Sequence, residues 1–191
     1  MGALTPEYNR SKIHQHKFAL WVGIGSIIMM FGALTSAYIV RRNSGNWFEF
    51  KIPDIFLLNT AVIILSSVTI HLSYKAFVRG AEKQYKGFLI ATFLLGIAFL
   101  ILQYKGWEAL TAIGATFTAN PSSSFMFVIP GLHAAHVLGG LGALTMAMLH
   151  AFILPFKPTP RRKLRFELVV QYWHFVDVLW VYLIVFFLLQ S

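Results

Sequence analysis

The chain has 191 residues, of which 57% are hydrophobic and only 12% are charged. This composition excludes an ordinary soluble domain and is typical of one membrane domain with several helices. The absence of cysteine excludes disulfides, iron–sulfur clusters and thiolate metal sites, and we assign the net charge of +9 to membrane topology rather than to nucleic-acid binding.

Five apolar runs follow one another along the chain, each near or above the roughly 20 residues that a helix needs to cross the hydrocarbon layer. They cover about 18–40, 55–78, 88–110, 125–154 and 168–189. The third is the weakest, because polar residues follow its short apolar part; its end either extends past the membrane or is buried against other protein. The pattern predicts an all-α integral membrane protein with five transmembrane helices. We expect a tail over 1–17 and one five-helix domain over 18–191.

Basic residues predict the orientation. Of the sixteen Lys and Arg, twelve lie in the tail or beside the second and fourth connections, and Lys157 is among them. The four on the opposite side include Lys51. Because Lys and Arg accumulate on the cytoplasmic side, we expect the N-terminus in the cytoplasm and the C-terminus outside.

Few ionisable residues lie deep in these runs. Asp177 lies roughly 14 Å from the start of the fifth run, near the middle of a ~30 Å hydrocarbon layer. His174 shares its helical face, and His133 and His136 share a face of the fourth run. We expect His133 or His136 to pair with Asp177 and offset the desolvation of both groups. The cluster is interpreted as stabilising. A proton relay is the alternative, although a relay normally has several carboxylates and only Asp177 lies deep.

A haem-binding membrane cytochrome is a second alternative. His136 and His150 lie on one face about 21 Å apart, a separation that suits two haems. Each haem also needs a second axial ligand from a facing helix, and only His71 and His174, on two different spans, remain. A small transporter is disfavoured because no internal repeat is visible. No hydrolytic triad or phosphate-binding loop is present.

Three motifs resemble a known family. Residues 172–180 read Tyr-Trp-His-Phe-Val-Asp-Val-Leu-Trp and follow Phe-Glu at 166–167. Residues 131–137 read Gly-Leu-His-Ala-Ala-His-Val, and Leu-Asn-Thr at 58–60 precedes Ser-Ser-Val-Thr at 66–69. From the first run to its end the chain resembles subunit III of haem-copper terminal oxidases, in a short five-helix bacterial form.

The resemblance implies an accessory subunit that carries no haem or copper of its own. It would pack against the catalytic subunit I, keep proton uptake fast and protect the active site from inactivation. Further expected partners are subunit II, a small subunit IV, membrane lipids and an electron-donating respiratory complex, in the bacterial cytoplasmic membrane. Cytochrome c is the preferred electron donor, and a quinol oxidase is the alternative. We expect no catalytic, cofactor-binding or metal-binding residue in this chain. A buried cluster with a structural or proton-tuning role is expected at His133, His136, Glu167, Trp173, His174 and Asp177.

The chain departs from the family pattern in two ways. Many members have a buried glutamate after a serine in the helix that matches the first run, but here Ser26 is followed by Ile27. The role of that carboxylate therefore does not carry over. Longer members also have two further N-terminal helices, which form a lipid-filled cleft with the other five. We expect another subunit to replace these helices and structural phospholipids to be bound.

Overall fold

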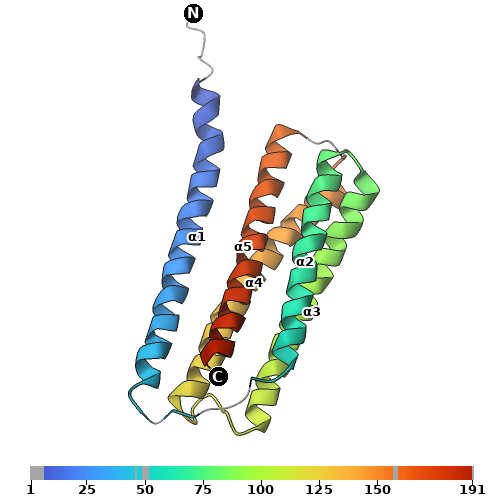
Figure 1. The fold of residues 1–191 in the computed structure, drawn as a ribbon. Helices are drawn as coiled ribbons and strands as arrows, with labels where there is room; N and C mark the ends of the chain where they lie inside the picture. The colour runs from blue at the N-terminus through green and yellow to red at the C-terminus, as the bar shows by residue number, and fades with distance from the viewer. Residues whose placement is uncertain (1–6, 46, 49–51, 157–158, 191) are drawn as a thin grey trace, which may run out of the picture.

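The computed structural model describes residues 7–45, 47–48, 52–156 and 159–190, and the side chains of the first helix from residue 15 onward. Residues 1–6 of the expected tail lie outside these ranges, as do Lys51 and Lys157 of the charge count. Five α-helices make up the fold, and no strand occurs in the described ranges (Figure 1).

The five helices follow the five apolar runs. They are α1 (Glu7–Arg42), α2 (Ile55–Val78), α3 (Glu82–Ala112), α4 (Pro121–Ile153) and α5 (Pro160–Gln190). Each is long and apolar enough to cross a membrane. The prediction of an all-α membrane protein with five spanning helices is confirmed.

Four of the helices extend beyond the predicted runs. Only α2 has the predicted bounds; α1 begins at Glu7, so part of the expected tail continues the first helix. The helices α3 and α5 begin at Glu82 and Pro160, before the predicted 88 and 168. The predicted runs are shorter than the helices because hydropathy detects only the apolar part of a helix. Backbone hydrogen bonding continues into the polar turns beyond that part.

The start of α4 is set by a capping box at Asn120, earlier than the predicted residue 125. The side chain of Asn120 accepts a hydrogen bond from the backbone N–H of Ser123 at 3.0 Å. In return the Ser123 hydroxyl accepts one from the backbone N–H of Asn120 at 3.3 Å. Pro121 occupies the first turn, where its missing N–H is not needed.

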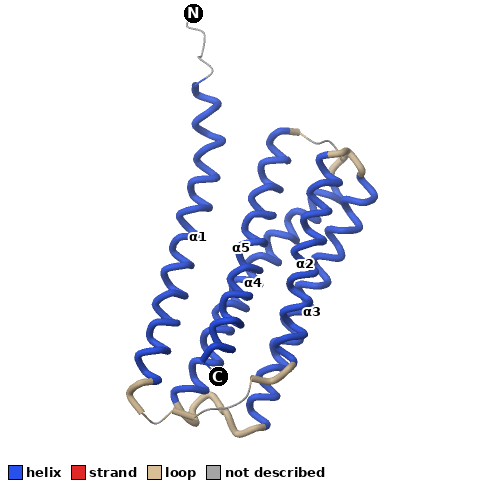
Figure 2. Tube along the Cα trace, in the orientation of Figure 1, coloured by secondary structure: helices blue, strands red, loops and turns tan. Residues whose placement is uncertain are grey.

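The helix α5 is the centre of the bundle. It contacts α1, α2 and α4, and α3 packs against α2 and α4. In the described ranges α1 contacts only α4 and α5, and Figure 2 shows it standing apart from the α2–α3 hairpin. The start of α1 and the end of α5 lie at opposite ends of the bundle (Figure 1).

Two glycines let α3 and α4 approach the large side chain of Trp173 on α5. A Cβ atom added to Gly96 would lie 2.9 Å from the Trp173 ring, and one added to Gly140 would lie 3.0 Å from it. Trp173 itself is fully buried. The absence of side chains at these positions therefore sets the distance between the helices.

We predict that Gly140→Val lowers the free energy of unfolding by about 1–3 kcal/mol, the usual cost of overpacking. The added methyl groups would meet the Trp173 ring. Gly142→Val is the matched control, since it lies on the same helix and undergoes the same change in helix propensity, but a Cβ atom added there would have no neighbouring atom within 4 Å. Denaturant titration of the chain in detergent micelles measures both. Equal losses for the two variants would contradict this packing argument.

Candidate functional site

Two tryptophans of α5 are hydrogen-bonded to hydroxyl groups of α2. The indole Nε1–H of Trp173 donates to Ser66 Oγ at 3.0 Å, and that of Trp180 donates to Thr60 Oγ1 at 3.0 Å. The tryptophans are seven residues apart and therefore share one helical face. We call the contact between these helices, from Thr60 to His71 on α2 and from Trp173 to Trp180 on α5, the α2–α5 seam.

His174 and Asp177 belong to the same seam. The hydroxyl of Ser67 is hydrogen-bonded to Nδ1 of His174 at 2.6 Å. Asp177 lies three residues beyond His174, on the same face of α5. The rings of His71 and His174 lie 5.9 Å apart between centroids. Asp177 is buried, and neither of its carboxyl oxygens has a hydrogen-bond partner among the described residues. The seam therefore contains one carboxyl whose hydrogen-bonding capacity is not used.

The expected pairing of Asp177 with His133 or His136 is wrong. The fully buried His133 donates from Nε2 to the backbone carbonyl of Val176 at 3.1 Å. Its target is thus the main chain one residue before Asp177, and neither carboxyl oxygen of Asp177 has a hydrogen-bond partner in the described ranges. The two helices do touch as expected, but their rotation brings the imidazole to the backbone rather than to the carboxyl.

His136 and His150 both bind their own helix. Nδ1 of His136 donates to the carbonyl of Leu132 at 2.7 Å, and Nδ1 of His150 donates to that of Met146 at 2.7 Å. The carbonyl of His136 also accepts a hydrogen bond from the hydroxyl of Tyr172 on α5 at 3.1 Å. His136 therefore lies beside α5 but outside the seam.

Glu167 lies apart from the rest of the predicted cluster. It forms an ion pair with Lys17 of α1 at 3.1 Å. Two further polar contacts join α1 to α5: Thr35 shares a hydrogen bond of 3.0 Å with Tyr182, and Arg42 donates to Gln190 at 2.7 Å. Of the six predicted site residues, the structure therefore brings Trp173, His174 and Asp177 together in the seam and places Glu167 at the α1–α5 contact.

The sequence interpretation missed the hydroxyl partners in α2. Thr60, Ser66 and Ser67 entered it only as part of a family motif, although their bonds hold the predicted tryptophan and histidine. The spacing of these residues could have revealed the contact. Ser66 and Ser67 follow Thr60 by six and seven residues on one helix, and the two tryptophans of the other helix are seven residues apart. A buried amide pair was also missed, in which Asn59 donates to Gln103 at 3.1 Å; this bond accounts for Gln103, the first polar residue at the end of the third run.

The histidines are not arranged as haem ligands would be. His71 and His174, the candidates for second axial ligands, face each other and not His136 or His150. The ring of His133 is enclosed by Phe99 and Trp180, at 5.6 and 4.9 Å between centroids. Within the described ranges no group of three or more His, Cys, Asp and Glu could hold a metal ion.

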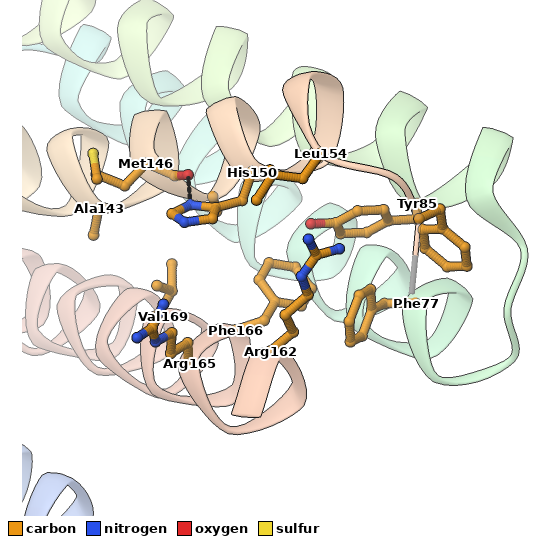
Figure 3. A pocket seen from close by; sticks show the side chains of 13 residues that line it. Phe77, Tyr85, Ala143, Met146, His150, Leu154, Arg162, Arg165, Phe166 and Val169 are labelled. Carbon is orange, nitrogen blue, oxygen red and sulfur yellow. Dashed lines mark hydrogen bonds between the residues drawn. The ribbon is translucent and has the colours of Figure 1, made fainter. Parts of the chain in front are cut away.

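A cavity of about 400 Å³ lies between α4, α5, the end of α2 and the start of α3 (Figure 3). Its walls are mainly apolar and include Met146, Ala147 and Phe166. Arg162 and Arg165 of α5 add two positive charges to the lining, and Arg162 also donates to the carbonyl of Pro155 at 2.7 Å. The cavity therefore suits a ligand with an apolar body and an anionic end.

The sequence of this chain is similar to a known family of membrane proteins. The sequence profile described as cytochrome c oxidase subunit III matches residues 48–191. A Corynebacterium diphtheriae protein named cytochrome c oxidase subunit 3 is 32% identical over 174 residues, which cover 84% of this chain and 83% of that protein. The chain belongs to the cytochrome c oxidase subunit III family.

Other members of the cytochrome c oxidase subunit III family are longer. The subunit 3 proteins of Gallus gallus and Oryctolagus cuniculus are 36% and 34% identical over 132 residues, covering 68% and 69% of this chain. The chain spans about half the length of these relatives, 48% and 49%. The matched region of the subunit III profile includes α2 to α5, and hence the whole seam. The resemblance drawn from the sequence motifs is thus confirmed.

We predict that Trp173→Phe lowers the free energy of unfolding by about 1–3 kcal/mol, because a buried hydroxyl loses its donor and the site is left underfilled. Trp21→Phe is the matched control: Trp21 is 61% exposed on α1, so a change within about 0.5 kcal/mol is expected. Denaturant titration in detergent again provides the measurement. If the exposed and buried substitutions cost the same, the seam does not hold α5 in place.

Proposed function

We propose that the chain is a non-redox accessory subunit of a bacterial cytochrome c oxidase, a haem-copper oxidase that reduces oxygen to water and translocates protons. The observation that carries the proposal is the family match over residues 48–191. Haem and copper would be held by the partner subunits I and II, and a small subunit IV completes the expected complex. Cytochrome c, rather than a quinol, is the donor named in the related proteins.

The internal bonding of the helices supports a scaffolding role. In the seam and around it, the indoles of Trp173 and Trp180 and the imidazole of His133 all bond to groups of neighbouring helices. Such bonds fix the rotation and depth of each helix, because hydrocarbon offers no alternative partners. A rigid four-helix core with a fifth helix at its side would present a stable surface to the catalytic subunit and support its proton uptake.

The charge distribution supports a cytoplasmic N-terminus in the bacterial inner membrane. Lys75 lies in the last turn of α2 and Arg79 follows that helix, Lys83 and Lys86 lie in the first turns of α3, and Arg162 and Arg165 lie in the first turns of α5. These ends lie at the same side of the bundle as the start of α1 (Figure 1). The positive-inside rule assigns that side to the cytoplasm.

The cavity at this end is the proposed phospholipid site. An acyl chain would occupy the apolar space beside Ala147 and Phe166, and the phosphate would lie near Arg162 and Arg165 (Figure 3). Guanidinium groups bind phosphate through paired hydrogen bonds, and the cavity volume lies within the usual range of ligand sites.

We predict that Arg162→Ala with Arg165→Ala reduces the amount of anionic phospholipid retained by the purified chain, because the phosphate loses both guanidinium partners. Quantitative lipid analysis of protein in mild detergent measures the retained lipid. The control pair Arg161→Ala and Lys163→Ala removes the same charge from residues that do not line the cavity. Equal lipid loss in both pairs would indicate general attraction to the membrane surface instead of a site.

We predict that a tagged copy of this chain co-purifies with haem and copper proteins in mild detergent. In that complex Asp177→Leu should leave the haem absorbance spectrum unchanged and shorten the period over which oxygen consumption is sustained. Val178→Leu, one residue further on the exposed side of α5, is the control. The assignment is wrong if the chain purified alone carries a haem spectrum, or if no haem protein accompanies it.

A further inference from the structure

A stripe of polar residues on α2 leads from the end of the helix to the α2–α5 seam. Lys75 lies in the last turn, His71 is exposed one turn deeper, and Ser67 is half-buried one turn deeper again. Residues four apart lie on the same helical face, with a rise of about 6 Å between them. Lysine side chains extend to the membrane surface, so the stripe begins where water is available.

Across the seam, α5 continues the stripe towards the protein interior. The ring of His174 lies 5.9 Å from that of His71, and its Nδ1 atom is hydrogen-bonded to Ser67 at 2.6 Å. Asp177 lies three residues beyond His174 on the same face of α5, and no hydrogen bond joins its carboxyl to Ser67. An exposed imidazole, a half-buried imidazole, a hydroxyl and a buried carboxyl therefore follow one another in order of increasing depth.

The carboxyl of Asp177 is the inner end of this series. Asp177 is 4% exposed, and neither oxygen is hydrogen-bonded within the described part of the chain. A buried polar group without a partner opposes folding, so this carboxyl is suited to take up a ligand. The ionisable groups that face it are His174 on α5, with His71 and Lys75 behind Ser67 on α2. On α4, His133 bonds to the preceding carbonyl, and Lys17 of α1 is paired with Glu167.

We propose that His71, His174 and Ser67 form a proton relay between the membrane surface near Lys75 and the carboxyl of Asp177. A proton taken up by His71 passes to the distal nitrogen of His174, across a gap that one ring rotation or one bridging water spans. His174 releases its Nδ1 proton to the oxygen of Ser67, whose own hydroxyl proton moves to the Asp177 carboxylate once the hydroxyl has rotated towards it. The net change is one proton gained by Asp177 and His174 left with its proton on Nε2 instead of Nδ1; rotation of the ring resets it, and release follows the reverse order.

This relay deepens the proton-tuning part of the proposed function, but it uses only residues of this chain. It therefore can be tested on the full chain in detergent, without partner subunits. A negative result would leave membership of the oxidase complex untouched, and failure to co-purify with an oxidase would leave the relay testable.

Infrared spectroscopy after a rapid pH jump measures the relay directly. The band to follow is the carboxyl absorption that disappears in Asp177→Asn. In His71→Leu and in Ser67→Ala we expect this band to appear at least about tenfold more slowly, since each change removes one proton carrier. Ser67→Thr keeps the hydroxyl and should restore the rate.

The matched controls are His16→Leu and Ser26→Ala on α1. His16 is exposed on α1, which makes no contact with α2 in the described ranges, and Ser26 donates to the Val22 carbonyl of its own helix. Both should protonate Asp177 at the normal rate, and circular dichroism confirms that each variant is folded. An unchanged rate in either His71→Leu or Ser67→Ala overturns the proposal, as does the absence of any band specific to Asp177. Should His71→Leu not fold, His71→Gln takes its place with the same expected slowing.

Discussion

The bonds between the α5 indoles and the α2 hydroxyls set the position of the central helix. Hydrocarbon supplies no hydrogen-bond partners, so an indole N–H in a spanning helix must find an acceptor inside the protein. Trp173 and Trp180 find theirs in Ser66 and Thr60 at the same distance of 3.0 Å. A shift of α5 along α2 by one turn would break both bonds at once. The register of the two helices is therefore fixed by polar contacts at two depths.

The rest of the bundle follows from this register. Trp173 requires a space without side chains on the neighbouring helices, and Gly96 and Gly140 provide it from α3 and α4. The helix α1 has fewer contacts with the bundle: polar contacts to α5 from Lys17, Thr35 and Arg42, and the packing of its buried Tyr38 against Phe186 and Phe187. Packing therefore holds four helices closely, while α1 remains at the periphery.

Sequence reasoning was sufficient for features that depend on the apolar pattern or on a motif along the chain. The number and order of the five spans and the family motifs belong to this kind, because hydropathy and spacing are read along the chain. The rotation of one helix against another is not encoded in this way. His133 and Asp177 lie at similar depths and on touching helices, yet the imidazole bonds to the Val176 carbonyl. A backbone carbonyl offers an acceptor at every residue, so spacing alone does not reveal it as the partner.

The seam thus combines two kinds of polar group with different physical consequences. The indole and hydroxyl groups are satisfied by each other and contribute to holding α5 on α2. The Asp177 carboxyl makes no hydrogen bond in the described ranges, so it adds nothing to that attachment, and its desolvation opposes the folded state. A scaffolding role alone accounts for the indole and hydroxyl groups but does not account for the buried carboxyl. The proposed proton relay would account for a carboxyl on the same helical face as His174, with Ser67 and His71 leading outward. Under that proposal the stabilising and proton-handling interpretations of the cluster are not alternatives, since each describes a different set of side chains in one seam.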